Sequence, residues 1–173
     1  MNSTQTIQSQ HTSKTAEFVK KFMNPINQWL FLWWKLPAAK YMGVKVTTLS
    51  PEKSIVTVPY NWRSQNPFRS TYFAAQAAAA EMSTGILASM AIYKRGKISM
   101  LITDMQAEYY KKVDKLATFT CSMGPEIFEA VQRAIDTKEG QTITAESIGT
   151  MPGDDGQPIV VSKFSFTWSF KAK

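Results

Sequence analysis

A single carboxylate lies within a long alanine-rich segment of the sequence. Glu81 is the only charged residue between Phe73 and Tyr93. An ionised carboxylate is costly to bury unless it is paired or hydrogen-bonded, so Glu81 either faces water or belongs to a polar site. If the segment is helical, the residues three and four positions away are the small residues Ala77, Ala78, Thr84 and Gly85. They leave room for a ligand beside the carboxylate, and Thr84 is placed to hydrogen-bond to it.

A polar loop precedes this segment and contains groups that suit a developing negative charge. Asn66 offers a side-chain amide, and Ser70 or Thr71 is placed to cap the following helix. The free backbone N–H groups at a helix N-terminus also favour negative charge. Such donors stabilise a carbonyl oxygen that becomes an oxyanion. The loop and Glu81 together indicate a site for chemistry on a carbonyl group. The alternative is that Glu81 points into solvent or bonds to a loop amide.

The scarcity of cysteine and histidine argues against other kinds of site. The 173-residue chain has one cysteine, Cys121, in an apolar run typical of a strand, and one histidine, His11, in a polar N-terminal segment. A Ser-His-Asp or Cys-His arrangement needs a histidine inside the fold, and structural zinc sites draw on several such ligands. We therefore expect no metal and no cofactor. A single cysteine suits a reducing compartment, so we expect a cytoplasmic protein.

Charge and hydrophobicity limit the classes of partner. The net charge of +7 comes from scattered basic residues, without a recognised basic-aromatic motif, so we expect no nucleic-acid partner. Residues 73–93 are long enough to span a bilayer, but Gln76 and Glu81 lie inside them. A charge at bilayer depth costs about 2.5–3.5 kcal/mol, and alanine offsets little of this. We expect a buried helix and no integral membrane association.

Hydrophobic periodicity predicts the elements that position the candidate site. Four helices are expected, beginning near Thr15, at Asn24-Pro25, near Tyr72 and at Pro125. Six strands are expected, at 43–49, 54–60, 98–110, 115–123, 141–151 and 158–171. The helix from Pro25 is expected to end at Pro37. The strand at 115–123 is expected to pair with the one at 98–110 across residues 111–114.

This order of elements predicts an α+β fold, in which a curved antiparallel sheet wraps around one long central helix. A helix covered on most sides must be apolar nearly all the way round, which explains the alanines. Residues 1–14 are predicted to be a disordered tail, and residues 15–173 a single domain with an extra N-terminal helical segment. The aromatic stripe within residues 26–33 is predicted to pack on the domain. The alternative is a membrane-surface or lid element.

Three stretches of the chain resemble one family. They are LPAAKYMGVKVTTLSPEKSIVTVPY, QNPFRSTYFAAQAAAAEMSTGILA and ITDMQAEYYKK. The region from Leu36 to Tyr110 is similar to the hotdog-fold thioesterases, especially their uncharacterised thioesterase-like members. In such families a loop Asn is followed fifteen residues later by a helix Asp or Glu, and Asn66 and Glu81 have that spacing.

The resemblance implies a hotdog fold and a homodimer, or a tetramer, in which each site forms between a loop of one chain and the helix of another. Glu81 would be the general base or nucleophile, and Asn66 would orient the water or the substrate. The substrate-binding residues would be Ser70, Thr71, Tyr72, Phe73 and Thr84. One departure is that Tyr72-Phe73 stand where better-studied members have His-Gly. Phe73 retains a backbone N–H, but its side chain is expected to narrow the site.

Two principal functions follow from these observations. The first is hydrolysis of an acyl-CoA or another acyl thioester, with the basic residues near Lys94-Arg95-Lys97 or the pair Lys111-Lys112 available for the CoA phosphates. The alternative, favoured by Phe73, is a non-catalytic hotdog module that binds an acyl chain or another apolar ligand. A third reading is a structural or membrane-surface protein that uses residues 24–35.

Overall fold

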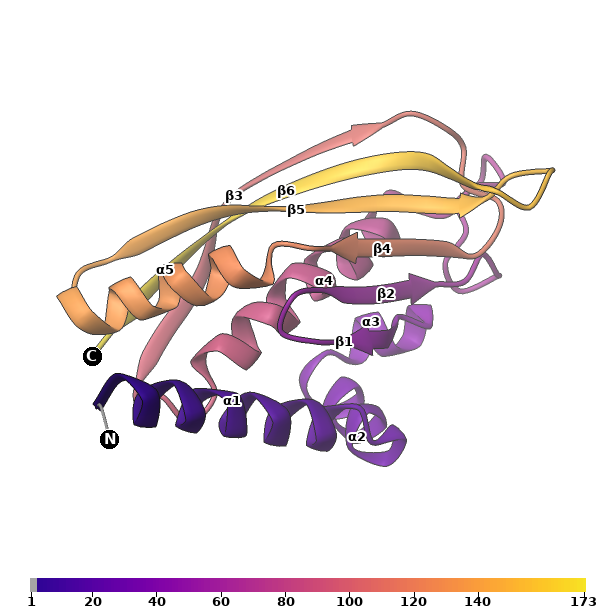
Figure 1. Cartoon of the computed structure of the whole chain (residues 1–173). Coiled ribbons are helices and arrows are strands. Elements are labelled where there is room, and N and C mark those ends of the chain that lie inside the picture. The colour runs from indigo at the N-terminus through magenta and orange to yellow at the C-terminus, as the bar shows by residue number, and fades with distance from the viewer. Residues whose placement is uncertain (1–2) are drawn as a thin grey trace.

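The computed structural model describes residues 3–173, with side chains from Ser13 onward (Figure 1). The helices are α1 (Ser3–Phe22), α2 (Pro25–Lys35), α3 (Pro37–Met42), α4 (Phe73–Ile92) and α5 (Gly124–Thr137). The strands are β1 (Lys45–Leu49), β2 (Ser54–Val58), β3 (Ile98–Tyr109), β4 (Ala117–Cys121), β5 (Gln141–Pro152) and β6 (Pro158–Ala172). The backbone of α1 begins at Ser3, earlier than the expected start near Thr15. The side chains of residues 1–12, His11 among them, lie outside the description, and the disorder of residues 1–14 stays a prediction.

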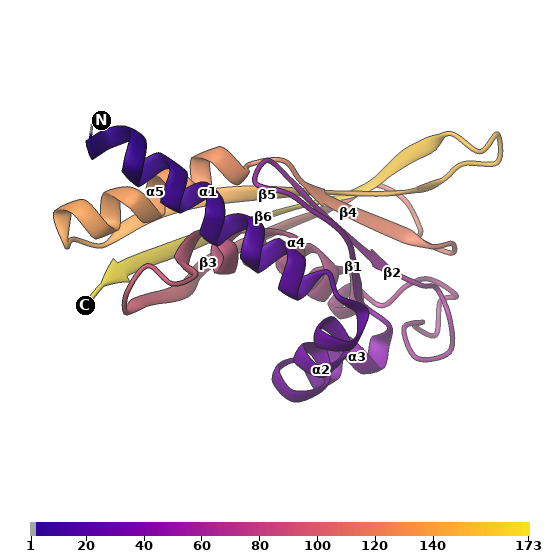
Figure 2. The same ribbon diagram turned by 60° about the horizontal axis from the view of Figure 1, so that its bottom comes forward.

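The six strands form one antiparallel sheet in the order β1-β2-β4-β5-β6-β3. The sheet curves over α4, and α1 lies on the far side of that helix from the sheet (Figures 1 and 2). The predicted α+β architecture, a curved sheet around one long helix, is therefore confirmed. β1 and β3 are the two edges of the sheet.

One predicted strand pairing is wrong. β3 pairs along its length with β6, from Ile98 opposite Ala172 to Tyr109 opposite Ser162, whereas β4 pairs with β2 and β5. The segment between β3 and β4 therefore is not a hairpin turn, and Val113 within it is fully buried. The Val113 carbonyl accepts a hydrogen bond from the Thr71 N–H (2.6 Å). This segment is thus bound to the loop before α4.

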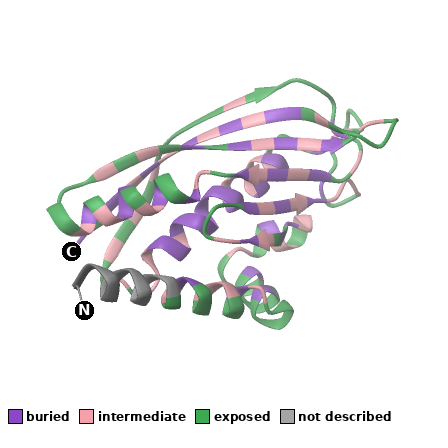
Figure 3. Cartoon of the chain, in the orientation of Figure 1, coloured by how far each residue is buried: buried purple, intermediate pink, exposed green. Residues whose placement is uncertain are grey.

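Helix α4 is buried as its alanines predict (Figure 3). Polar side chains join it to the sheet. The Ser83 hydroxyl lies 2.7 Å from the Ser147 hydroxyl of β5. On β6, alternate residues face the helix. The buried set is Phe164, Phe166, Trp168 and Phe170, as the alternation predicts. The alanines allow a close approach, and the hydroxyl pair fixes the position of the helix on the sheet.

The N-terminal helices differ in detail from the prediction. Asn24 caps α2 as expected, because its Oδ1 accepts hydrogen bonds from the N–H groups of Ile26 (3.0 Å) and Asn27 (3.2 Å). Pro37 ends α2 but also begins α3, after a non-helical Leu36. Figure 2 shows α2 and α3 together beyond one end of α1.

The predicted packing of the aromatic stripe is wrong. The stripe residues of α2 are exposed: Ile26, Trp29, Leu30 and Trp33. The helix instead buries Gln28 and Leu32. The Gln28 amide donates to the Val46 carbonyl and accepts from the Val46 N–H, both at 3.1 Å. Gln28 thereby satisfies the free edge of β1, and this pairing determines which face of α2 turns inward.

Candidate active site

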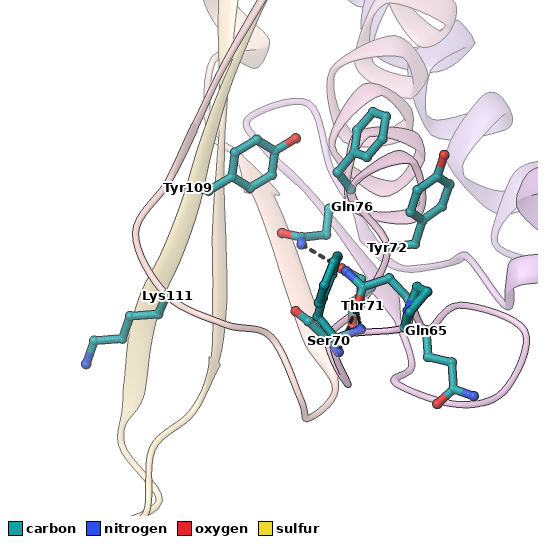
Figure 4. Close-up of a pocket in the computed structure, with 11 residues that line it drawn as sticks. Gln65, Ser70, Thr71, Tyr72, Gln76, Tyr109 and Lys111 are labelled. Atoms are coloured by element: carbon teal, nitrogen blue, oxygen red, sulfur yellow. Dashed lines mark hydrogen bonds between the residues drawn. The ribbon is translucent and has the colours of Figure 1, made fainter.

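A cavity of about 550 Å³ lies where the loop before α4 meets the end of β3 (Figure 4). Its lining residues are Gln65, Asn66, Pro67, Phe68, Ser70, Thr71, Tyr72, Phe73, Gln76, Tyr109 and Lys111. Five of the seven predicted site residues line this cavity: Asn66, Ser70, Thr71, Tyr72 and Phe73. The structure therefore brings together the loop half of the predicted site.

The two ends of the Asn66 side chain have different roles. Its Oδ1 accepts hydrogen bonds from the backbone N–H groups of Phe68 (3.0 Å) and Ser70 (3.1 Å), which closes a tight turn in the loop. These donors identify the oxygen end of the amide. The Nδ2 group has no hydrogen bond to any described residue. Asn66 is therefore available to a ligand as a donor and not as an acceptor.

The N-terminus of α4 carries no side-chain cap. Tyr72 occupies the cap position and makes no capping hydrogen bond through its side chain. The expectation that Ser70 or Thr71 caps the helix is wrong. The Ser70 hydroxyl instead accepts from the Val113 N–H (3.0 Å) and donates to the Val113 carbonyl (3.2 Å). The first N–H groups of α4 therefore keep their preference for a negative charge.

Thr71 adds an unsatisfied polar group to the same cavity. Its side chain is 1% exposed, and its hydroxyl is the one buried side-chain polar atom without a hydrogen-bond partner among the described side chains. Buried hydroxyls without a partner are rare because no hydrogen bond compensates for the hydration that they lose on burial. Such a group lining a cavity fits a site that receives a polar ligand atom.

Aromatic rings and one buried amide complete the walls. The Tyr72 and Phe73 rings meet edge to face, 4.8 Å between centroids. Sequence reasoning did not assign Gln76 to the site. Its Nε2 donates to the Thr71 carbonyl (3.1 Å), and its Oε1 accepts from Ser162 (3.2 Å). Figure 4 shows this amide pointing toward Thr71. The sequence signal that could have identified Gln76 is that it is a polar residue within an alanine-rich helix.

Glu81 lines a second cavity, of about 290 Å³, between α2, α4 and β3. The lining residues are Phe31, Lys35, Leu36, Glu81, Met82, Gly85, Ile86, Ser89 and Met100. Burial raises the pKa of the Glu81 carboxyl above its ordinary value. The carboxylate makes no hydrogen bond or ion pair with any described residue. It is thus a desolvated acid beside an open space.

Within one chain, Glu81 and Asn66 are not brought together. Glu81 comes eight positions after Phe73, the first residue of α4, which is about 12 Å along a helix axis. The two residues line separate cavities. The expectation that Thr84 bonds to the Glu81 carboxylate is wrong as well. Thr84 is fully buried, donates to the Glu81 backbone carbonyl (3.0 Å) and accepts from the Trp168 indole N–H (3.0 Å). These two hydrogen bonds join Thr84 to α4 and β6, and its predicted part in substrate binding stays a prediction.

Two further properties concern the whole of the described chain. No group of three or more His, Cys, Asp or Glu side chains within it is arranged to hold a metal ion. Among the helices from Ser3 onward, none combines the length and the apolarity needed to cross a bilayer.

Comparison with known proteins places these features in a family. The model of the family described as Domain of unknown function (DUF4442) matches residues 28–149, more than half of the chain. No curated protein sequence matches significantly.

Solved structures with the same fold share little sequence with this chain. A protein of unknown function from Chlorobaculum tepidum has a TM-score of 0.70 at 15% identity, covering 92% of this chain and 94% of its own. A thioesterase from Haemophilus influenzae has a TM-score of 0.60 at 13% identity, and the match covers 90% of this chain and 95% of that protein. A thioesterase family protein from Silicibacter pomeroyi has a TM-score of 0.60 at 11% identity, and the match covers 92% of this chain and 99% of that protein. At these identities the likeness establishes the hotdog fold.

Proposed function

Because the chain belongs to the DUF4442 family and has the hotdog fold of thioesterase-like proteins, we propose that it hydrolyses an acyl thioester such as acyl-CoA. The observation that carries the proposal is the state of Glu81: a largely buried carboxyl, without a partner, that lines a cavity on the central helix. A structural carboxylate would be hydrogen-bonded or paired. A general base must be free to accept a proton, and a raised pKa brings the pKa of the Glu81 carboxyl closer to a neutral working pH.

The second half of the proposed site is the cavity at the N-terminus of α4. The Asn66 Nδ2 group, the Thr71 hydroxyl and the first helix N–H groups are donors without a side-chain partner there. Glu81 takes a proton from water, the hydroxide adds to the thioester carbon, and the carbonyl oxygen becomes an oxyanion held by these donors. The carbon–sulfur bond then breaks, and the departing sulfur takes the proton that Glu81 removed from the water. Acid and free thiol are the products.

A homodimer would unite the two halves. Glu81 and Asn66 lie too far apart along one chain, so the site needs the loop of one chain beside the helix of another. β3 supports this arrangement because it is an open edge of the sheet with exposed apolar residues, Leu101 and Met105. A strand edge of this kind is a template for pairing with a second chain. We accordingly propose a dimer, in a reducing compartment such as the cytoplasm.

Of the two basic pairs considered for the CoA phosphates, the structure favours the one near the cavity. Lys111 lines the cavity and lies on its outer side in Figure 4. Lys94, by contrast, forms an ion pair with Glu17 at 2.7 Å. A phosphate group that extends from the cavity would therefore meet Lys111 rather than Lys94.

A panel of acyl-CoA substrates of graded chain length, with detection of the released thiol, tests the proposal. Glu81→Gln keeps the size of the side chain and removes the base, so hydrolysis should fall by about 100-fold or more. Glu139→Gln is the matched control, because Glu139 is exposed and far along the chain on the α5–β5 connection. Equal thiol release by wild type, both variants and buffer would refute hydrolysis by this site.

A second candidate function is binding of an acyl chain without turnover. It is favoured by Phe73, which is 55% exposed at the first position of α4 and adds an apolar ring to the lining of the cavity. Native mass spectrometry of the purified protein separates the two functions. A tightly bound lipid together with no hydrolysis supports binding alone, and turnover without retained ligand supports the hydrolase.

A further inference from the structure

Helix α2 buries one face and exposes a second face that is made of large apolar residues. Gln28 and Leu32 are buried against the rest of the chain. The other face is exposed, to the following fractions: Ile26 69%, Trp29 48%, Leu30 41%, Trp33 54% and Trp34 76%. Figure 3 shows this helix as mainly exposed. An exposed group of large apolar side chains on one face of a helix indicates an interaction surface.

These five residues form one continuous stripe. At 3.6 residues per turn they occupy roughly 140° of the helix circumference, centred opposite Gln28 and Leu32. The Trp29 and Trp33 rings stack at 5.9 Å between centroids with an interplanar angle of 4°. We refer to Ile26, Trp29, Leu30, Trp33 and Trp34 as the tryptophan face. This stacking orders two of the three tryptophan rings of the face.

The charge around the tryptophan face has one sign. The sequence from 18 to 51 contains the lysines Lys20, Lys21, Lys35, Lys40 and Lys45 and no acidic residue. Lys20, Lys21 and Lys35 are exposed and stand near the ends of α1 and α2. Lys40 Nζ lies 5.8 Å from the centroid of the Trp29 ring. None of these lysines forms an ion pair with a described residue, so the apolar stripe is bordered by unpaired positive charge.

We propose that the tryptophan face binds the surface of an anionic lipid membrane, with α2 lying in the plane of the interface. Helices of this kind insert an apolar face about 5–10 Å into the headgroup region while basic side chains contact anionic lipids. Tryptophan is enriched at that level of the bilayer. The inference concerns α2 alone and holds whether or not the chain hydrolyses a thioester.

The charge pattern favours a membrane over a second copy of the chain. In a two-fold interface the same patch faces itself, so the lysines of both copies would be brought near one another without an acidic partner. An anionic lipid surface complements them instead, at a gain of about fivefold in binding for each lysine near the surface. The border of the tryptophan face also leads to the Glu81 cavity, because Phe31 and Lys35 line that cavity. Membrane binding would place this cavity next to acyl chains.

Vesicle flotation of the full chain, without any substrate, tests the proposal. The probes are vesicles of phosphatidylcholine alone and of phosphatidylcholine with about one-third phosphatidylglycerol. We expect the wild type to float with the anionic vesicles, with at least about tenfold weaker binding to the neutral ones. Trp33→Ser with Trp34→Ser should reduce the binding about tenfold or more. Lys20→Glu with Lys21→Glu should reduce it by more than about 25-fold.

Trp62→Ser is the matched control, because Trp62 is 76% exposed, as Trp34 is, but lies in the loop before α4. It should leave vesicle binding unchanged. Quenching of tryptophan fluorescence by brominated lipids should occur in the wild type and be lost in the double tryptophan variant. The proposal is overturned if the wild type floats with neither vesicle. It is equally overturned if Trp34→Ser converts a dimer to a monomer in light scattering while flotation is unaffected, because the face then belongs to a second copy.

Discussion

A methyl group added at Gly85 would lie 3.0 Å from Oε1 of Glu81 and 3.3 Å from the indole ring of Trp168. Gly85 follows Glu81 by one turn of α4, so the two positions are neighbours on the helix surface. The space beside the carboxylate therefore exists because position 85 has no side chain. Glycine lowers the stability of a helix, and Gly85 stands where any side chain would fill the space beside Glu81.

Gly85→Ala should reduce acyl-thioester hydrolysis about tenfold or more by crowding the Glu81 carboxylate. The free energy of unfolding should change by less than about 1 kcal/mol, because alanine's better helix propensity offsets the tight contact. Steady-state kinetics and urea unfolding measure the two effects. Gly140→Ala is the control, since no atom lies within 4 Å of its added methyl. Unchanged kinetics in Gly85→Ala would show that the cavity beside Glu81 is not used.

Glu81→Gln should stabilise the protein at neutral pH. The pKa of Glu81 is raised in the folded chain by burial, so the folded state binds the proton more tightly than the unfolded state. The contribution of Glu81 to the free energy of unfolding therefore falls as pH rises from its ordinary pKa, about 4.3, through the raised value. Thermal unfolding at pH 7 should show a higher Tm for the variant, and the difference should vanish below about pH 4. A lower Tm at pH 7 would indicate a hidden partner for the carboxylate.

Asn66→Asp and Asn66→Ala should separate the two roles of the Asn66 side chain. Asp keeps an oxygen for the N–H groups of Phe68 and Ser70, so its free energy of unfolding should stay near that of the wild type. Ala loses both hydrogen bonds and should cost about 1–2 kcal/mol. Both lack the Nδ2 donor, and hydrolysis should fall about 100- to 1,000-fold in each. A wild-type rate in Asn66→Asp would remove Asn66 from the oxyanion site.

Gln28→Ala should destabilise the protein by about 2–4 kcal/mol, because it leaves the N–H and carbonyl of Val46 without partners at a buried edge. Asn27→Ala is the comparison, as the neighbouring Asn27 is exposed and donates a single hydrogen bond, to the Lys21 carbonyl. Urea unfolding should give a clearly lower midpoint for Gln28→Ala than for Asn27→Ala. Equal midpoints would mean that α2 does not hold the β1 edge.

Cys121 should be inert in the folded protein. It is fully buried on β4, and burial raises the pKa of its thiol to about 11. Thiolate is the reactive form, so Ellman's reagent at pH 8 should label almost none of the native protein and about one thiol per chain in urea. Rapid labelling without denaturant would contradict this. An inert thiol also means that the thiol released by hydrolysis can be measured without a background from the protein.

Several features follow from local sequence patterns. The alternation of aromatic and polar residues on β6 identifies its buried face, because successive side chains of a strand point to opposite sides. The alanines of α4 predict a helix covered on most sides, and Asn24-Pro25 predicts the start of α2. In each case the sequence pattern and the structural feature that it predicts involve residues that are neighbours along the chain. The pairing of Asn66 with Glu81 as a site is also a sequence inference, and it stays a prediction.

The remaining features depend on contacts between distant segments, which no local pattern encodes. The sequence determined that the chain has a long buried helix and strands with one apolar face. Only the tertiary structure decided that β3 pairs with β6 rather than β4, because Val113 binds the loop before α4. It also decided that α2 turns Gln28 inward and its tryptophans outward, because the Val46 backbone at the β1 edge requires two hydrogen bonds. The spacing of hydrophobic residues shows which side chains a helix or strand could bury. Hydrogen bonds to unpaired polar groups of other segments then decide which of its faces is buried.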